Sequence, residues 1–352
     1  MLLGVPVLVA MLLWGDNAPP QRTLPADFEC RGPLAVVADR LLAEAPQTLA
    51  DLADGLAGER QPVVAIVSDP AARERVGEFF GRRGLRSTTL LLPVDTLWLR
   101  DFGPLLASDG PRWTALDFCY NRRSGPAPRD RDDKAAAVLA ERLHVPVEPV
   151  PLAIEPGNIL SNGAGIVLTT TRSLDANIQP DRPKEAALAQ LGRCLGAAEI
   201  VVLEPLQGDT TGHVDLFACW TDRHTVVLGR YDPADDPFNA PILERNAERL
   251  AKVRAADGRP LRVVRVPMGD NADGRFRTYT NVLFVAGRLF VPSYRGEKAK
   301  TNEEVEAVFG QALPGWKIRR VACDRLIELG GALRCMGLVL PNAGLVPAGG
   351  LE

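Results

Sequence analysis

The chain has 352 residues, of which 46% are hydrophobic and 24% charged, an ordinary globular balance that suffices for one large domain or two smaller ones. Its formal net charge of −3 excludes the strongly basic field of a typical nucleic-acid-binding protein, so we expect no nucleic-acid partner. The six cysteines lack the close spacing of a zinc knuckle and there are only three histidines, so we expect no metal centre.

The chain begins with an apolar run from Leu2 to Trp14, followed by the polar, proline-rich residues 15–24. This run is too short to span a bilayer comfortably, so we expect no stable membrane insertion. It has the length of a signal peptide but lacks the basic residues and the cleavage site of one. Two interpretations of residues 1–23 stay open: a signal peptide, signal-like over residues 1–15, on an exported protein, or an N-terminal extension with a buried first strand on a cytoplasmic protein.

From residue 61 onwards, short apolar runs typical of strands alternate with amphipathic stretches typical of helices. The predicted strands are Gln61–Val67, Ser87–Leu92, Trp113–Phe118, Gly165–Thr170, Glu199–Leu203, Val214–Trp220, Thr225–Gly229, Leu261–Val266, Thr280–Val285 and Arg288–Val291. The predicted helices are Ala71–Arg83, Asp133–His144, Lys184–Leu195, Pro241–Arg254 and Glu303–Gln311. This alternation predicts an α/β fold without a linker between two domains. No glycine-rich phosphate-binding motif is present, so we expect no nucleotide cofactor.

The segment from Trp98 to Pro104 is the first that carries chemical groups near a turn. Its Gly-Pro pair ends any regular element and places Asp101 at a turn. One interpretation is a local ion pair between Arg100 and Asp101 with no further role. The other is a cation site, because a tryptophan ring and a carboxylate on one loop both attract positive charge.

Two further segments carry acidic residues before predicted strands. Glu155 and Asn158 flank a Pro-Gly pair, which on its own indicates only an ordinary turn. His213 and Asp215 are two residues apart at the start of the predicted strand Val214–Trp220, where alternation would place them on one face. A lone histidine is more often structural, but the nearby carboxylate favours a shared site.

The last two segments bring an amide and a thiol. Asn281 begins the β-run that reaches Val285, where it can support a turn or a neighbouring loop. Cys335 follows a glycine pair that allows close backbone approach, and the adjacent Arg334 would favour the thiolate if its side chain turned inward. A buried structural thiol is the alternative for Cys335. A thiol with one histidine and acids is the minimum set for nucleophilic catalysis.

Together these segments resemble the bacterial agmatine deiminase and peptidylarginine deiminase family of the guanidine-modifying superfamily. The patterns W-x-R-D-x-G-P, E-x-G-N, G-H-V-D, Y-x-N and G-G-x-x-x-C occur in the family's order, and the match runs from about Leu24 to about Pro341. The resemblance implies a pseudo-five-fold α/β propeller of ββαβ units around a central active site. It also implies a catalytic domain over residues 24–345, followed by a tail over residues 346–352.

At the matching positions, the resemblance implies Cys335 as the nucleophile, His213 as the acid/base, Asp101 and Asp215 as the carboxylates that hold a guanidinium group, and Glu155 as the residue that orients the histidine. It places three further residues at the substrate: Trp98, Asn158 and Asn281.

The sequence departs from the family pattern at the residue before the nucleophile, which is usually histidine and is Arg334 here. Pro156 replaces a glycine of the usual E-G-G-N, and Met336 begins a stretch unlike the one that follows the cysteine of agmatine deiminases. No reacting group is lost, so activity is compatible with these changes, whereas specificity for agmatine is put in doubt.

A basic segment bears on the substrate. Residues 117–123 are similar to the stretch in which secreted peptidylarginine deiminases hold a substrate carboxylate with arginines, which implies substrate binding by Arg122 and Arg123. Arginine or a peptide that ends in arginine has such a carboxylate, and agmatine has none. The alternative is a solvated basic loop, because Arg129 and Arg131 continue the run of charge.

The expected function is hydrolytic deimination of agmatine, arginine or peptidylarginine to a ureido product and ammonia, through a thiouronium on Cys335 and without a cofactor. One alternative is an amidinotransferase, in which an amine replaces water. Another is a catalytically silent guanidinium-binding protein. The expected partner is a small guanidino compound or an arginine-containing peptide; the oligomeric state stays open, with a homodimer as one option.

Overall fold

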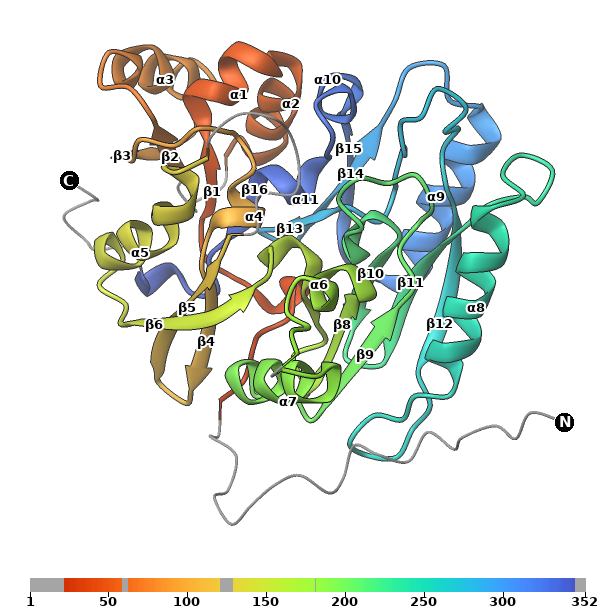
Figure 1. Ribbon diagram of the computed structural model, residues 1–352. Helices are drawn as coiled ribbons and strands as arrows, with labels where there is room; N and C mark the ends of the chain where they lie inside the picture. The colour runs from red at the N-terminus through yellow and green to blue at the C-terminus, as the bar shows by residue number, and fades with distance from the viewer. Residues whose placement is uncertain (1–21, 59–62, 121–128, 181, 346–352) are drawn as a thin grey trace, which may run out of the picture.

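The computed structural model describes residues 22–58, 63–120, 129–180 and 182–345 (Figure 1). Residues 1–21 of the predicted leader and the tail from residue 346 lie outside these ranges. Thr23 is described and pairs with Ser108 in an isolated β-bridge. No helix in the described ranges is long and apolar enough to cross a membrane.

Four three-stranded sheets repeat one pattern, in which an antiparallel pair is followed by a helix and a parallel third strand. The first unit contains β4 (Leu105–Asp109), β5 (Arg112–Cys119), α5 (Asp132–Arg142) and β6 (Val147–Ala153). The second contains β7 (Leu160–Ser161), β8 (Ile166–Thr170), α6 (Thr171–Asp175), α7 (Lys184–Leu195) and β9 (Glu199–Leu203). The third contains β10 (Ala218–Asp222), β11 (Thr225–Arg230), α8 (Asn239–Ala251) and β12 (Arg262–Pro267). The fourth contains β13 (Leu283–Val285), β14 (Arg288–Ser293), α9 (Ala299–Ala312) and β15 (Lys317–Ala322).

The fifth unit is assembled from both ends of the described chain. The last strand, β16 (Gly337–Val339), pairs antiparallel with β1 (Leu34–Val37), which pairs parallel with β2 (Val63–Val67). A fourth strand, β3 (Ser87–Leu91), extends this sheet, and its helices are α1 (Ala38–Glu44), α2 (Pro46–Leu56) and α3 (Ala72–Gly81). The pseudo-five-fold propeller of ββαβ units is thereby confirmed.

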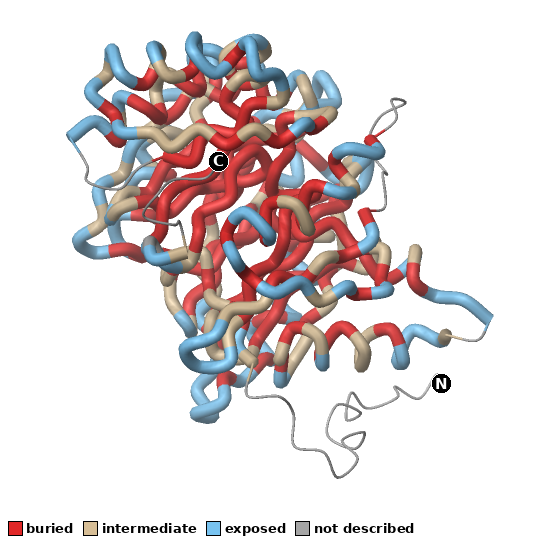
Figure 2. The backbone as a smooth tube through the Cα atoms, turned by 90° about the vertical axis from the view of Figure 1, so that its left-hand side faces the viewer, coloured by how far each residue is buried: buried red, intermediate tan, exposed pale blue. Residues whose placement is uncertain are grey.

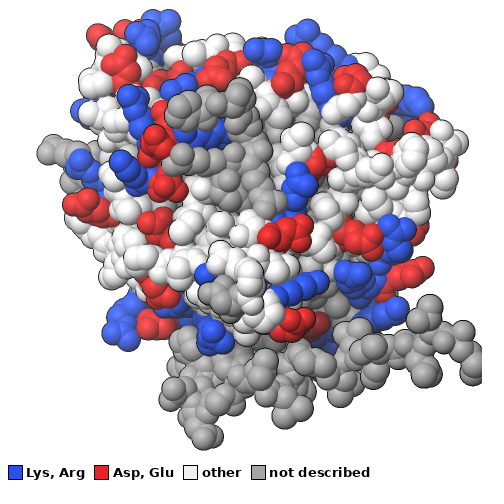
Figure 3. All heavy atoms as spheres, in the orientation of Figure 1, with Lys and Arg blue, Asp and Glu red and all other residues white. Residues whose placement is uncertain are grey.

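The strands form the interior and the helices the outer layer, which Figure 2 shows as buried strands beneath partly exposed helices. Every residue of β1 and β2 is buried. Strands covered on both faces read as continuous apolar runs, which is the pattern that predicted them. The face in Figure 3 carries interspersed acidic and basic side chains, without a patch of one sign.

Short helical turns lie outside the five sheets, and several of them carry candidate site residues. They are α4 (Leu99–Phe102), α10 (Asp324–Glu328), α11 (Leu333–Met336), η1 (Asp27–Glu29), η2 (Pro156–Asn158), η3 (Val214–Leu216) and η4 (Ala343–Leu345), where η denotes a 3-10 helix.

The predicted strand Val214–Trp220 is wrong in its first half. Asp215 lies in η3, His213 is its extended N-terminal cap, and the strand begins only at Ala218. The two side chains therefore do not share a strand face, although they share a cavity. The cause is a turn too short to produce a helical period in the sequence.

Candidate active site

The candidate residues occupy equivalent places in the five units, because each precedes the first strand of its unit. Asp101 lies in α4 before β4, and Glu155 precedes η2 and β7. His213 caps the N-terminus of η3 and Asp215 lies within it, before β10. Two residues complete the set: Asn281 before β13 and Cys335 in α11 before β16. Pseudo-five-fold symmetry therefore brings segments up to 234 positions apart, Asp101 to Cys335, to one centre.

A cavity of about 430 Å³ opens at this centre. Six of the predicted site residues line it: Trp98, Asp101, His213, Asp215, Asn281 and Cys335. Glu155 and Asn158 are buried behind its wall. Arg122 and Arg123 lie outside the described residues.

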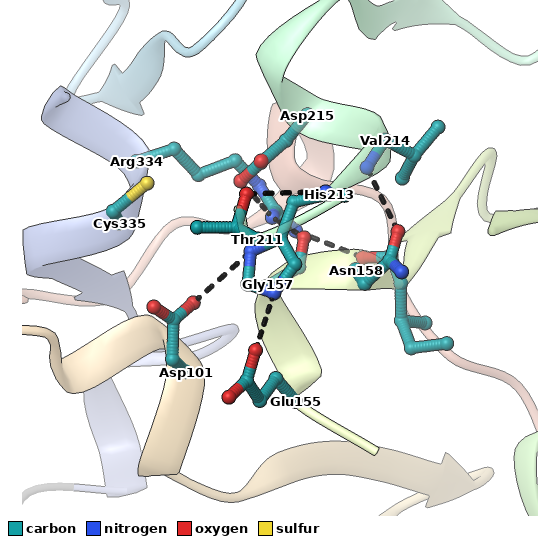
Figure 4. Close-up of polar contacts among 12 residues, drawn as sticks. Asp101, Glu155, Gly157, Asn158, Thr211, His213, Val214, Asp215, Arg334 and Cys335 are labelled. Carbon is teal, nitrogen blue, oxygen red and sulfur yellow. Dashed lines mark hydrogen bonds and ion pairs between the residues drawn. The ribbon is translucent and has the colours of Figure 1, made fainter. Parts of the chain in front are cut away.

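His213 lies between two carboxylates, as Figure 4 shows. Its Nε2 is 2.6 Å from Oε2 of Glu155, and its Nδ1 is 3.7 Å from Oδ1 of Asp101. Burial opposes a charge on the ring, but the carboxylates of Asp101 and Glu155 outweigh it and raise the pKa of His213 to about 10. The imidazole is therefore protonated at neutral pH and can act as a general acid.

At Asp101 the effect of burial prevails. It raises the carboxyl pKa to about 7 against the opposing charge of His213. Gly157 makes this arrangement possible. A Cβ atom at Gly157 would lie 2.1 Å from Oδ1 of Asp101 and 3.1 Å from Nδ1 of His213. The glycine kept from the family's E-G-G-N pattern is thus the one that leaves room for the acid and the histidine.

The thiol of Cys335 is 8% exposed and faces the cavity. Its Sγ is 3.4 Å from Nδ2 of Asn281, whose Oδ1 accepts the Arg334 backbone N–H at 2.7 Å. Burial, followed by the charges of Asp215 and Asp101, raises the pKa of the Cys335 thiol well above its ordinary value. Without a bound cation the residue is a thiol at neutral pH.

The side chain of Arg334 turns inward, but its guanidinium pairs with Asp215 and Asp27 rather than with the thiol of Cys335. Nη1 of Arg334 donates to Oδ2 of Asp215 at 2.8 Å, and Nε donates to Oδ2 of Asp27 at 2.7 Å. Oδ1 of Asp215 is buried and has no hydrogen-bond partner among the described residues.

The side chain of Asn158 binds other protein groups and does not line the cavity. Its Nδ2 donates to the hydroxyls of Thr170 and Ser173, and its Oδ1 accepts the Val214 N–H at 2.8 Å. It therefore holds η3 in place and with it His213 and Asp215.

Three residues that the sequence did not single out belong to this centre: Asp27, Arg129 and Gly157. Arg129 is 8% exposed, lines the cavity and donates from Nη1 to the hydroxyl of Tyr120 at 2.6 Å. Its burial was not predicted, because the neighbouring charged residues indicated a solvated loop. Within the described ranges, no group of three His, Cys, Asp or Glu side chains is arranged to hold a metal ion.

A model of the Porphyromonas-type peptidyl-arginine deiminase family matches residues 34–341. The chain belongs to this family. Membership of the deiminase family makes it a hydrolase of carbon–nitrogen bonds, as the motifs predicted.

Individual relatives of this deiminase are distant. Agmatine deiminase of Ectopseudomonas mendocina is 27% identical over 277 residues, which cover 70% of this chain and 74% of that protein. Agmatine deiminase of Enterococcus faecalis superposes with a TM-score of 0.76 at 22% identity, covering 93% of this chain and 99% of that one. A cysteine-to-serine variant of agmatine deiminase from C. jejuni with substrate bound gives 0.77 at 22% identity, covering 94% and 97%. At such identities the structures support the fold alone.

Proposed function

We propose that this deiminase hydrolyses a guanidinium group to a ureido group and ammonia through a covalent adduct on Cys335. The supporting observation is the convergence of Cys335, His213, Asp101 and Asp215 on one cavity. We assign the catalytic domain to residues 24–345. The relatives named agmatine deiminase and the family's own name are consistent with this reaction class.

The substrate guanidinium lies between Asp101 and Asp215. Oδ1 of Asp215 is buried without a hydrogen-bond partner among the described residues, and Oδ1 of Asp101 faces His213 at 3.7 Å without a hydrogen bond. The two carboxylates accept hydrogen bonds from the edges of the planar cation, which holds its carbon near Cys335. Trp98 lines the same cavity, where an aromatic ring favours a cation.

Substrate binding activates the nucleophile. The charges of Asp215 and Asp101 contribute to the raised pKa of Cys335, and a bound cation offsets their effect. The thiol then loses its proton to solvent, and the thiolate attacks the guanidinium carbon to give a neutral tetrahedral adduct. Asn281 donates an N–H to the sulfur and keeps it in place.

Protonated His213 gives its proton to one amino group, which leaves as ammonia while a cationic thiouronium remains on Cys335. The neutral imidazole accepts a proton from the water that attacks this carbon. Collapse of the second adduct breaks the C–S bond, and the proton of its hydroxyl group passes to the leaving sulfur. This leaves the ureido product, the Cys335 thiol and a protonated His213. Glu155, bound to Nε2, keeps the ring oriented throughout.

The direct test is an assay for ureido product and ammonia with agmatine, free arginine and peptidylarginine. Turnover of at least one of them supports the proposal. The amidinotransferase alternative predicts a new guanidino product when glycine or ornithine is supplied. The silent binding protein predicts guanidinium binding without product, and its Cys335 would not react with a haloacetamidine at any pH.

Arg129 should favour a substrate that carries a carboxylate. Asp209 and Glu328 also line the cavity, but Asp209 accepts hydrogen bonds from Thr211 and Gly212, and Glu328 is paired with Arg325. We therefore expect higher kcat/KM for arginine than for agmatine.

Arg129→Gln should lower kcat/KM for arginine by about tenfold or more while leaving that for agmatine within about threefold. Arg131→Gln is the matched control, because Arg131 lies in the same segment and its side chain is 63% exposed. A uniform loss for both substrates in Arg129→Gln would contradict the role.

A cationic alkylating agent should test whether the carboxylates of Asp101 and Asp215, here called the clamp, attract a cation independently of the reactivity of the thiol. We expect 2-chloroacetamidine to inactivate the enzyme at least about 100-fold faster than the neutral chloroacetamide at pH 8, because Asp101 and Asp215 attract the cation. Both rate constants depend on the same fraction of ionised Cys335, so this fraction cancels in their ratio.

This ratio should fall as the pH is lowered through about 7, the pKa of Asp101, since protonation removes one carboxylate of the clamp. The charged groups that face Asp101 are His213, Glu155, Asp215 and Arg334. Rate constants from pH 6 to 9 for the wild type and Asp101→Asn test this. A ratio that is independent of pH, or unchanged by the substitution, would contradict the clamp.

A further inference from the structure

The protein places a guanidinium of its own on the carboxylate that is proposed to bind the substrate. Arg334 is 2% exposed and makes four side-chain hydrogen bonds: to Asp27, Asp215 and the carbonyl oxygens of Gly157 and Ile159. Four of its five N–H donors are thereby used, so moving this side chain would leave several buried acceptors unpaired.

Arg334 creates an electrostatic difficulty for the proposed reaction. A single carboxylate cannot be the full counterion of two guanidinium cations in a poorly solvated site. Arg334 occupies Oδ2 of Asp215 and leaves Oδ1 for the substrate. The charge of Arg334 must therefore be balanced from its other side.

Asp27 supplies that balance. It lies in η1, 307 positions before Arg334, and its Oδ2 accepts the Nε–H of Arg334 at 2.7 Å. Its Oδ1 is 3.6 Å from Nη2 of Arg100, which is also buried. Arg334 sustains the ionised form of Asp27, so that the carboxyl pKa lies below its ordinary value despite strongly opposing burial.

The contacts join seven charged side chains next to the cavity into two groups, and all of them except the part-exposed Asp27 are buried. In the first, His213 contacts Asp101 and Glu155, which leaves one negative charge when all three are ionised. In the second, Arg334 joins Asp27 to Asp215, and Arg100 adjoins Asp27, which leaves no net charge. Together the two groups carry one negative charge, which matches one guanidinium cation, and Arg129, which also lines the cavity, belongs to neither group.

We infer that Asp27 is a positioning residue for substrate binding: it shares the charge of Arg334 and so leaves Asp215 able to bind a second guanidinium. This inference rests on the proposed function of the cavity. Without the Asp27 charge the second group becomes cationic and opposes the substrate. Without the Arg334 charge it becomes anionic and attracts the substrate.

The two residues therefore give variants with opposite expected effects. Asp27→Asn should raise KM for arginine by about tenfold or more, with kcat within about threefold, because ground-state attraction is lost. Arg334→Gln removes the cation without adding a titratable group and should leave KM equal or lower. The double variant restores the charge balance, so its KM should return to within about threefold of the wild type.

A merely structural ion pair predicts a different pattern, in which both single variants lose affinity alike and the double variant is no better. That pattern would overturn the inference, as would an unchanged KM in folded Asp27→Asn. Asp236→Asn is the matched control, because Asp236 is buried, accepts hydrogen bonds from Asn239 and Asn271, and does not line the cavity. It should alter thermal stability without changing KM.

The same comparison should be made by calorimetric binding of arginine, with each substitution placed in a Cys335→Ser background at pH 8. The binding measurement needs no turnover. A wild type without activity would contradict the proposed function, and the binding data would still test the role of Asp27. If Asp27→Asn does not fold, Asp27→Glu against Asp27→Gln replaces it. Retained affinity in the glutamate variant alone supports the inference, and equal affinity in the two overturns it.

Discussion

Replacing Cys335 with alanine should abolish ammonia release, lowering the rate by at least about a thousandfold, because no other described group in the cavity can form the thiouronium. The side chain is small and borders an existing cavity, so we expect a stability loss of no more than about 2 kcal/mol. The measurements are ammonia release with saturating substrate and thermal unfolding of the same preparation.

Cys219→Ala is the control for this experiment. Cys219 is 3% exposed, lies in β10 and does not line the cavity. We expect it to lose stability comparably and to retain turnover. Full activity in Cys335→Ala would show that the nucleophile is assigned wrongly, whatever the behaviour of the control.

The second large effect is expected for Gly157→Ala. The added methyl group would lie 2.1 Å from Oδ1 of Asp101, a distance that real Cβ contacts do not reach, so Asp101 and His213 must move apart. Displacement of catalytic groups by about 1 Å can cost about a hundredfold in rate, and we expect kcat/KM to fall by at least that much. Overpacking should add about 1–3 kcal/mol of instability.

Gly77→Ala provides the matched comparison, because Gly77 lies in the middle of α3 and an added Cβ there would meet no atom within 4 Å. Helix propensity predicts a stability gain of about 0.5–1 kcal/mol and unchanged kinetics. If Gly157→Ala retained wild-type kcat/KM, the close approach of Asp101 to His213 would not matter for catalysis.

Local patterns predicted most strands and helices, because their apolar periods extend over five or more residues. They could not predict η3, a single turn without a period, and this error placed His213 and Asp215 on a strand. The convergence of the site followed from the family resemblance rather than from periodicity, since five turns distant in sequence must meet.

The sequence did not reveal which charged side chains pair with one another in the structure. Arg334 and Asp27 are 307 positions apart, and no local signal pairs them. Arg129 looks like part of a solvated basic run, yet packing against Tyr120 buries it. Side-chain direction decides such cases, and it depends on tertiary contacts that a single sequence does not display.

The pairing of β16 with β1 has a consequence for biosynthesis. Cys335 lies in the turn immediately before β16, so the proposed nucleophile and the strand that completes the fifth unit are synthesised together, after the other four units. A ribosome-bound chain that has not yet released this segment has four units, an unpaired edge on β1 and no sulfur at the centre. We therefore expect the proposed reaction only after β16 has paired with β1 and completed the fifth unit.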